Sequence, residues 1–275
     1  MESGDFYKKE QDRWGQNADF YKSEIASPFF RKLLEKKVIC YGKEPFDGKL
    51  VADIGSGNGF FLNYLRRRFD FYSVNIDFSL AMLASGKNVF GSSRKTYWVN
   101  GGAEQLPFKN ESVETAVFNG ALHHFKALRV LEPAVEETYR VLRPGGTVCI
   151  FDRNGSFSSH FFHSVALYGK KVLERFTGTL SSSSSDREPD FGDADLKFFF
   201  DRGFTLKRRL YASSVPFFIA LVFCNAIEYT AGARVAAAVR HCAFPVAAIF
   251  ENYLCFKAFS IEQCLLLEKT RSGEQ

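Results

Sequence analysis

A glycine-rich turn after a short apolar run constrains this 275-residue chain more than any other feature. Residues 49–54 read Lys-Leu-Val-Ala-Asp-Ile, and Gly55, Gly57 and Gly59 follow at alternate positions. An apolar run that breaks into glycines predicts a buried strand turning sharply into a helix. Glycines lack a Cβ, so the backbone can lie directly against a ligand at the N-terminus of that helix. The stretch predicts a nucleotide-type site, and a glycine-rich turn without a ligand is the alternative.

The spacing of these glycines narrows the kind of nucleotide. The pattern G-x-G-x-G, preceded by Asp53, differs from the dinucleotide fingerprint G-x-G-x-x-G and from the phosphate loop that ends in G-K-[ST]. A second predicted strand, residues 71–77, ends in Asp77, and an acidic side chain about twenty residues past the glycines reaches a ribose hydroxyl pair. This spacing alone does not separate adenosylmethionine from a nicotinamide cofactor. A role for Asp77 as the cap of the helix that begins near Ser79 also stays open.

Three further sequence motifs follow the glycine turn along the chain. Residues 102–108 read Gly-Ala-Glu-Gln-Leu-Pro-Phe, residues 113–125 end in Leu-His-His-Phe, and residues 132–146 end in Arg-Pro-Gly-Gly. Together with the D-I-G-x-G-x-G turn, they resemble the class I S-adenosylmethionine-dependent methyltransferases that act on small molecules and lipids. The resemblance covers about residues 50–153. It implies an α/β fold, a seven-stranded Rossmann-like sheet that is parallel except near its final strand, with S-adenosylmethionine as the cofactor.

The resemblance also implies which residues bind the cofactor. Asp53 is expected to organise the glycine loop and the methionine amino group, Asp77 the ribose, and Phe78 with Ala103 the adenine. The family has an aspartate at position 102, and Gly102 removes that acceptor for the adenine amino group, leaving Ala103 N–H and Glu104 or Gln105 to compensate. The full set expected to contact the cofactor is Asp53, Gly55, Ser56, Gly57, Asp77, Phe78, Gly102, Ala103, Glu104 and Asn119.

No catalytic residue is assigned from the sequence. Methyl transfer is an in-line displacement at the methyl carbon of a sulfonium, so catalysis depends mainly on proximity and alignment. A base is needed only if the acceptor must lose a proton, and the imidazoles of His123 and His124 suit that task. The alternative is that one histidine packs in the structure and the other is exposed.

The predicted organisation has three parts: an N-terminal helical cover (1–39), a methyltransferase core (40–211 and 260–270) and a hydrophobic helical insertion (212–259). The insertion is inferred because the two strands that flank it are much too far apart for a hairpin. Its first apolar run, about residues 215–227, is shorter than the roughly 20 residues that span a bilayer. We interpret the insertion as a lid over an apolar acceptor pocket. A helical pair that only covers one end of the sheet is the alternative.

Composition narrows the expected partners and location. The net charge is +5 and the basic residues are spread along the chain, so no nucleic-acid partner is expected. Six cysteines without C-x-x-C pairing predict neither a metal site nor disulfides, but reduced thiols in a cytoplasmic protein, and the first residues do not read as a secretory signal. The Phe-rich insertion and the basic residues Lys207, Arg208 and Arg209 favour a peripheral membrane contact.

The predicted function is methyl transfer from S-adenosylmethionine to a small, lipophilic acceptor. One rival is a nicotinamide-dependent oxidoreductase on a related fold, and the glycine spacing with segments 103–108 and 122–124 counts against it. A second rival is a methyltransferase-like domain without turnover that acts as a binding or scaffold protein, which Gly102 favours. Affinity for S-adenosylmethionine separates these hypotheses.

Overall fold

The computed structural model describes residues 28–154, 189–214 and 260–270. These residues fall into two compact units, and the larger one contains residues 28–152, 189–209 and 264–270 and holds the glycine turn. In chain order the elements are α2 (Pro28–Tyr41), β1 (Leu50–Ile54), α3 (Phe60–Leu65), β2 (Tyr72–Asp77), α4 (Leu80–Phe90), β3 (Thr96–Asn100), β4 (Val113–Asn119), α5 (Leu122–Ala127), α6 (Leu131–Val141), β5 (Leu142–Arg153), α8 (Lys197–Phe200), β6 (Phe204–Ser214) and β7 (Ser260–Lys269).

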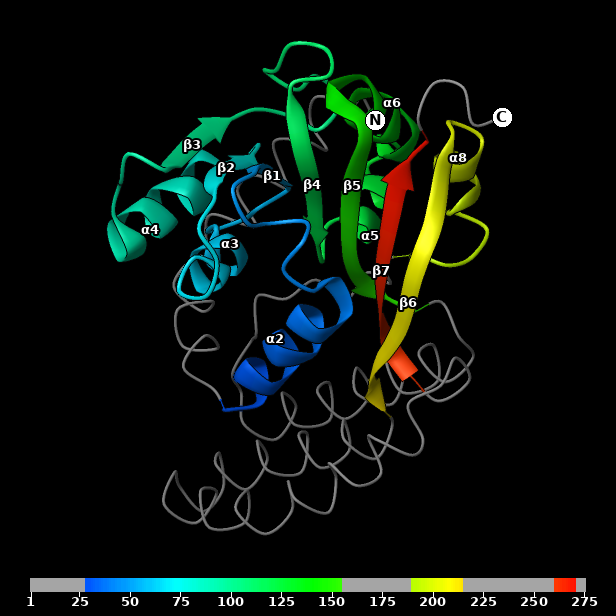
Figure 1. Ribbon diagram of the computed structural model, residues 1–275, viewed down its shortest axis with the longest axis horizontal. Helices are drawn as coiled ribbons and strands as arrows, with labels where there is room; N and C mark the ends of the chain where they lie inside the picture. Colours follow the sequence, from blue (N-terminus) through cyan, green and yellow to red (C-terminus); the bar gives the residue numbers. More distant parts are fainter. Residues whose placement is uncertain (1–27, 155–188, 215–259, 271–275) are drawn as a thin grey trace, which may run out of the picture. The chain divides into compact units, whose positions relative to one another are not determined.

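The seven strands form one sheet in the order β3-β2-β1-β4-β5-β7-β6 (Figure 1). β1 pairs in parallel with β2 and β4, and the pairs β2–β3 and β4–β5 are also parallel. Figure 1 shows β7 running opposite to its neighbours β5 and β6. The expected seven-stranded α/β sheet, parallel except near the final strand, is therefore confirmed. Because the strand order reverses between β1 and β4, a crevice is expected at the carboxyl ends of these two strands.

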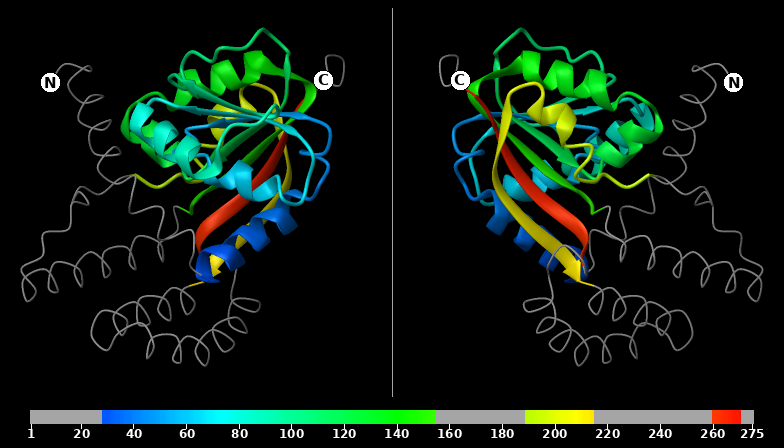
Figure 2. Two further views of the ribbon diagram at one scale, coloured as in Figure 1. Left: turned by 90° about the vertical axis from the view of Figure 1, so that its left-hand side faces the viewer. Right: turned by 90° about the vertical axis from the view of Figure 1, so that its right-hand side faces the viewer.

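Helices cover both faces of the parallel part of the sheet, with α6 on one face and α3 on the other (Figure 2). A parallel strand covered on both faces must be apolar on both sides, which explains the continuous apolar run of β1. Val51, Ala52 and Ile54 are fully buried there. Asp53 is buried among them, so the carboxylate that precedes the glycine turn lies inside the core.

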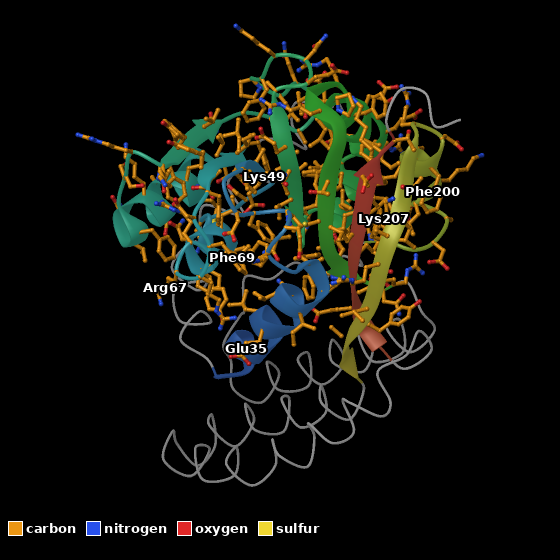
Figure 3. The ribbon with its side chains drawn as sticks, in the orientation of Figure 1. Glu35, Lys49, Arg67, Phe69, Phe200 and Lys207 are labelled. Atoms are coloured by element: carbon orange, nitrogen blue, oxygen red, sulfur yellow. The ribbon has the colours of Figure 1, made fainter. Side chains whose placement is uncertain are left out.

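Helix α2 begins at Pro28, and proline is well suited to the first turn of a helix. Its C-terminal end is fixed by Tyr41, whose ring meets Phe61 of α3 edge-on with centroids 6.4 Å apart. Arg68 lies 3.9 Å from Glu35, and Figure 3 shows Glu35 close to the turn after α3 that carries Arg67 and Phe69. This packing places one face of α2 against the core. The rest of the predicted N-terminal cover, residues 1–27, lies outside the described residues.

The last two strands bracket the predicted insertion. β6 continues to Ser214, beyond the predicted end of the core at residue 211, and β7 begins at Ser260 as predicted. Residues 215–259, which carry the apolar run and the proposed lid, lie outside the described residues, so the three-part organisation stays a prediction. Within the described ranges, no helix has the length and apolar character needed to cross a bilayer.

Candidate functional site

The turn between β1 and α3 has the left-handed backbone that its glycines allow. Gly55, Gly57 and Gly59 have φ angles of 74°, 56° and 65°. Residues with a Cβ adopt such positive φ angles only under strain. The N–H groups of Gly55 and Ser56 both donate to Ile76 O, at 2.9 Å each. These bonds pin the turn to β2 and bring Gly57 close to the carboxyl end of that strand.

Asp77, the last residue of β2, supports the glycine turn directly. Its Oδ2 accepts from Gly57 N at 2.7 Å and its Oδ1 accepts from Ser79 N at 2.8 Å. Burial raises the pKa of the Asp77 carboxyl to about 6, and the two N–H donors oppose that rise. The helix cap left open in the sequence belongs to Ser79, whose Oγ accepts from Met82 N. Asp77 thus connects the start of α4 with the turn, and each of its oxygens has a second lone pair for a ligand.

A small open cavity lies beside Asp77. It brings together five of the residues predicted to bind the nucleoside: Asp77, Phe78, Gly102, Ala103 and Glu104. Its remaining lining is Gly55, Gly101, Phe125, Leu128 and Val130. The wall combines an aromatic ring, aliphatic side chains and two carboxylates, which suits a flat heteroaromatic ring joined to a sugar. Asp53, Ser56, Gly57 and Asn119 are not part of this lining.

Glu104 takes the space that a side chain at position 102 would occupy. A Cβ built on Gly102 would lie 2.4 Å from Glu104 Oε1 and 2.5 Å from Oε2. Both distances are far below van der Waals contact, so the absence of a side chain at Gly102 allows the Glu104 carboxylate to lie there. The sequence left Glu104 and Gln105 as alternatives for the missing aspartate, and the carboxylate of Glu104 lies beside position 102.

Asp53 lies at the centre of the carboxyl edge of the sheet, and the whole residue is only 1% exposed. Neither Oδ1 nor Oδ2 has a hydrogen-bond partner in the part of the chain that the structure describes. Burial, and then the charge of Asp77, raises the pKa of Asp53 to about 8, while Lys37 opposes the rise. A buried carboxylate without partners is costly unless a ligand completes it. The ammonium of an amino-acid moiety would do so, and in this respect the residues present fit S-adenosylmethionine.

Lys37 of α2 reaches the carboxyl ends of β4 and β5. Its Nζ donates to Asn119 Oδ1 at 2.5 Å and lies 3.6 Å from the centroid of the Phe151 ring. The residue is only 2% exposed. Asn119 was predicted to contact the cofactor, and the structure joins it to a lysine that the sequence did not single out. No local pattern marks Lys37, because its partners are far away in the chain.

The second feature of this edge is a histidine–aspartate pair. His123 Nδ1 lies 2.7 Å from Asp152 Oδ1, and the side chains are 6% and 0% exposed. Asp152 Oδ2 also accepts from the backbone N–H of Leu122 and His123, at 2.8 and 3.3 Å. The ring of His124 lies against that of His123, tilted by 43° and with ring centroids 3.9 Å apart. The sequence pointed to both histidines but not to Asp152, although its place near the end of the fifth strand could have drawn attention to it.

Residues 52–150 match a protein family described as a methyltransferase domain. The chain is 29% identical over 131 residues to a human protein named probable tRNA methyltransferase 9B, covering 46% of this chain and 27% of that protein. It is 31% identical over 141 residues to malonyl-[acyl-carrier protein] O-methyltransferase of Marinomonas sp. (strain MWYL1), covering 51% and 48%. It is 32% identical over 115 residues to demethylmenaquinone methyltransferase of Staphylococcus aureus, covering 42% and 46%. The chain thus spans less than half the length of these relatives.

Solved structures share the fold at low sequence identity. One is phosphoethanolamine N-methyltransferase 2 of Haemonchus contortus in complex with S-adenosyl-L-methionine, with a TM-score of 0.55, 17% identity and coverage of 86% of this chain and 53% of that one. Another is the [4+2]-cyclase SpnF, with a TM-score of 0.55, 17% identity and coverage of 88% and 82%. The same fold therefore serves more than one chemistry.

The strand order, the glycine turn and the cavity beside Asp77 define a class I methyltransferase core. With the family match, they show that residues 52–150 form a domain of the S-adenosylmethionine-dependent methyltransferase type.

Proposed function

We propose that the protein transfers a methyl group from S-adenosylmethionine to a small, lipophilic acceptor. The observation that carries the cofactor assignment is the Asp53 carboxylate, which is buried and makes no hydrogen bond among the described residues. It lies next to the glycine turn, and a cavity opens beside Asp77. The ammonium of the methionine moiety binds Asp53, and the backbone of Gly55, Ser56 and Gly57 lies along the ligand. Asn119 completes this part of the site from the end of β4.

The nucleoside occupies the cavity beside Asp77. Both oxygens of Asp77 keep a lone pair for the ribose hydroxyls after accepting from the protein backbone. The adenine ring lies against Phe78 and Ala103. Glu104, folded over Gly102, accepts from the adenine amino group in place of an aspartate at position 102.

The lipophilic nature of the acceptor is supported by sequence and by one relative. Residues 215–227, outside the described ranges, are almost entirely apolar, and a relative is named for a demethylmenaquinone acceptor. The predicted peripheral membrane contact rests on the same segment and on the basic residues before it. Since another relative is named for tRNA, a nucleic-acid acceptor is the competing hypothesis, and the spread of basic residues along the chain disfavours it.

Calorimetry with S-adenosylhomocysteine and with NADH tests the cofactor, and we expect binding of the first only. S-adenosylhomocysteine formation from S-adenosylmethionine, with naphthoquinols and with tRNA transcripts as probes, then tests the acceptor. Turnover with the quinols alone supports the proposal, and turnover with tRNA alone overturns its acceptor class. Phe217→Asp with Phe218→Asp should lower quinol turnover and flotation with anionic vesicles, whereas unchanged values in both assays would reject the lid and the membrane contact.

The alternative is a methyltransferase-like domain that binds but does not turn over. Gly102 favours this alternative in the sequence, but the carboxylate of Glu104 lies beside Gly102, and its proposed role as the adenine acceptor counts against the alternative. Tight S-adenosylhomocysteine binding without turnover on any probe would favour the alternative.

A further inference from the structure

The amino-terminal ends of β1, β2 and β3 gather basic residues that lie apart in the sequence. The first two N–H groups of β2 donate to Lys49 O at 2.9 Å and to Lys95 O at 2.8 Å, so the three strands begin in one row. Arg66, directly after α3, joins this row, because its Nη1 donates to Ser93 Oγ at 3.0 Å in the turn before β3. We call this row the basic edge. Its basic residues, two of which are labelled in Figure 3, are Lys49, Arg66, Arg67, Arg68, Arg94 and Lys95.

Carboxylates neutralise only part of the basic edge. Lys95 Nζ lies 2.5 Å from Asp70 Oδ1, and an Arg68 nitrogen lies 3.9 Å from Glu35 Oε1. Asp47 is also at this edge, since its Oδ1 accepts from Asp70 N at 3.3 Å. Within the described residues, no ion pair involves the other four basic side chains, which are those of Lys49, Arg66, Arg67 and Arg94. Three of these four carry a guanidinium group, whose geometry matches a phosphate. The basic edge therefore has an excess of positive charge that suits a chain of phosphates.

Two tyrosine side chains lie next to the basic edge on neighbouring strands. In the parallel pair β2–β3, Val74 is in register with Tyr97. Tyr72 precedes Val74 by two residues, so its side chain is on the same face of the sheet as that of Tyr97. The two tyrosines are 46% and 49% exposed. Lys95 Nζ lies 5.4 Å from the centroid of the Tyr72 ring, and Tyr97 Oη donates to Arg94 O at 3.1 Å. Two half-exposed rings and the basic groups thus form one continuous surface.

This combination of groups fits a single-stranded nucleic acid. Proteins that bind single strands hold the phosphates with Lys and Arg and stack successive bases on aromatic side chains. The bases of a duplex are already stacked on each other, so a duplex could use the charges but not the rings. An anionic membrane would also match the charges, but side chains that insert into lipid are mainly Trp, Phe and Leu. The two exposed rings here are tyrosines, and the hydroxyl of Tyr97 is bonded to the protein backbone.

We propose that the basic edge, with the rings of Tyr72 and Tyr97, binds a single-stranded nucleic acid. The phosphates contact the guanidinium groups and two bases stack on the rings. The bases held here are too far from the cofactor site to be methylated, because β2 places Tyr72 about 17 Å from Asp77 along the strand. The inference therefore does not rest on the proposed function. It revises the expectation of no nucleic-acid partner, since basic residues that are spread along the chain meet in space.

Fluorescence anisotropy of the full chain with a labelled twelve-nucleotide oligouridylate tests this surface. We expect roughly micromolar affinity at about 50 mM salt, which falls as salt is added. An RNA duplex of the same length should bind about tenfold more weakly, because its bases do not reach the rings. Equal or tighter binding of the duplex would mean that charge alone attracts the RNA, and would overturn the proposal.

Substitution of the rings tests the stacking. Tyr72→Leu and Tyr97→Leu should each weaken oligouridylate binding about tenfold, because leucine keeps an apolar side chain without a flat ring. Tyr97→Phe should bind like the wild type. Phe200→Leu is the matched control, since Phe200 is 44% exposed and α8 packs near β6, the strand at the other edge of the sheet from β3. Unchanged affinity in both tyrosine-to-leucine variants would show that the rings do not stack on bases.

The salt dependence tests the phosphate contacts. Arg67→Gln and Arg94→Gln, both at exposed positions, should each reduce the slope of log K against log salt concentration by about 0.7. Lys197→Gln, whose side chain is 77% exposed on α8, is the control and should leave the slope unchanged. Melting temperatures check that the variants are folded. A slope that is the same in the wild type and both arginine variants would contradict the proposed contacts.

Two further measurements separate this proposal from its neighbours. If the wild type does not bind oligouridylate but floats with anionic vesicles, and Arg67→Gln with Arg94→Gln abolishes flotation, the basic edge is a membrane surface and the proposal is wrong. Saturation with S-adenosylhomocysteine should leave oligouridylate affinity unchanged, because the two sites lie at opposite ends of β2. Oligouridylate binding by a wild-type protein that does not bind S-adenosylhomocysteine would reject the proposed function and support the basic edge.

Discussion

The carboxyl edge of the sheet has two halves that hold their functional groups in different ways. At β1 to β3, the polar contacts come from the backbone, since Gly57 N and Ser79 N both donate to Asp77. At β4 and β5, two backbone N–H groups donate to Asp152, and side chains also contact each other, Lys37 with Asn119 and His123 with Asp152. A backbone donor is present whatever the residue, but a side-chain donor is lost with one substitution.

The two halves differ in which residue substitutions they should tolerate. The half at β1 to β3, where we propose that the cofactor binds, has its geometry set by backbone angles. We call it the cofactor half. A side chain can therefore change there if a neighbour supplies the same chemical group, as we propose for the carboxylate of Glu104 beside Gly102. The β4–β5 half depends on the identity of each residue. Acceptor specificity is therefore expected to reside in the second half.

Asp53 lies where the two halves meet, in register with Asn75 of β2 and Val117 of β4. Replacing its carboxyl group should change the stability of the protein more than any other substitution considered. Burial raises the pKa of its carboxyl from 3.8 to about 8. Between these values the unfolded chain releases a proton that the folded chain keeps, so stability falls as the pH rises, by roughly 1 kcal/mol per pH unit. Asp53→Asn should match the wild type near pH 4 and be more stable near pH 8. Urea unfolding of the ligand-free protein at both pH values measures this.

The same variant should bind S-adenosylhomocysteine more weakly, since it lacks the carboxylate assigned to the ligand ammonium. Stability gained together with affinity lost is the behaviour of a binding group rather than a structural one. Asp201→Asn, at an exposed carboxylate, is the control and should leave both properties unchanged. Loss of stability in Asp53→Asn at both pH values would contradict the assignment and the idea that Asp53 separates the two halves.

Gly57→Val tests whether the cofactor half depends on its backbone. Gly57 has a φ of 56°, and an added Cβ would lie 3.1 Å from the end of Met82. A β-branched residue in this conformation costs about 1–3 kcal/mol of stability and covers the ligand face of the turn. Binding of S-adenosylhomocysteine should become undetectable by calorimetry.

Gly91→Val is its matched control, because Gly91 has a φ of 73° and open space around it. Its strained backbone should lower stability in thermal unfolding, whereas its affinity for S-adenosylhomocysteine should stay normal. If the two variants bind alike, the glycine turn is not the cofactor loop.

Asp77 combines support of the loop with the proposed ribose contact, and its substitution should have a smaller effect. Asp77→Ala leaves Gly57 N and Ser79 N without their acceptor, which costs about 1–3 kcal/mol of stability. Asp77→Asn keeps one oxygen and should lie between the alanine variant and the wild type. Calorimetry with adenosine and 2′,3′-dideoxyadenosine isolates the ribose contact, since only the wild type should prefer adenosine strongly. A preference retained in Asp77→Ala would leave Asp77 with the loop-supporting role alone.

The positions of the residues in the cofactor half could be predicted because they belong to short sequence motifs that follow one another along the chain. Gly57 and Asp77 are 20 positions apart and each ends or follows a recognisable strand. The order of these motifs also predicted the sheet, since β1, β2 and β4 are each followed by a helix. The β4–β5 half depends on contacts across 29 positions for His123–Asp152 and 82 for Lys37–Asn119. Nothing local selects Lys37 among the lysines of α2, because only the packing of α2 decides which of them is buried.

Gly102 allows the smallest and most specific test of the comparison. If the cofactor half accepts a carboxylate from either of two neighbouring positions, then Gly102→Asp and Glu104→Ala should each weaken binding of S-adenosylhomocysteine by only a few fold. In Gly102→Asp the new side chain meets Glu104, whose Oε1 lies 2.4 Å from the Cβ position, and the two carboxylates repel each other. In Glu104→Ala the adenine amino group loses its acceptor, worth about 1 kcal/mol.

The double variant should regain wild-type affinity, because one carboxylate then stands at position 102 without a competitor. A double-mutant cycle by calorimetry measures this coupling, and Gln105→Ala is the matched control that should change nothing. S-inosylhomocysteine, which has a carbonyl oxygen in place of the amino group, adds a second readout. The wild type and the double variant should discriminate against it, whereas Glu104→Ala should not. Additive losses in the cycle would mean that the carboxylate of Glu104 does not replace the missing aspartate, and the two halves would then depend equally on the identity of their side chains.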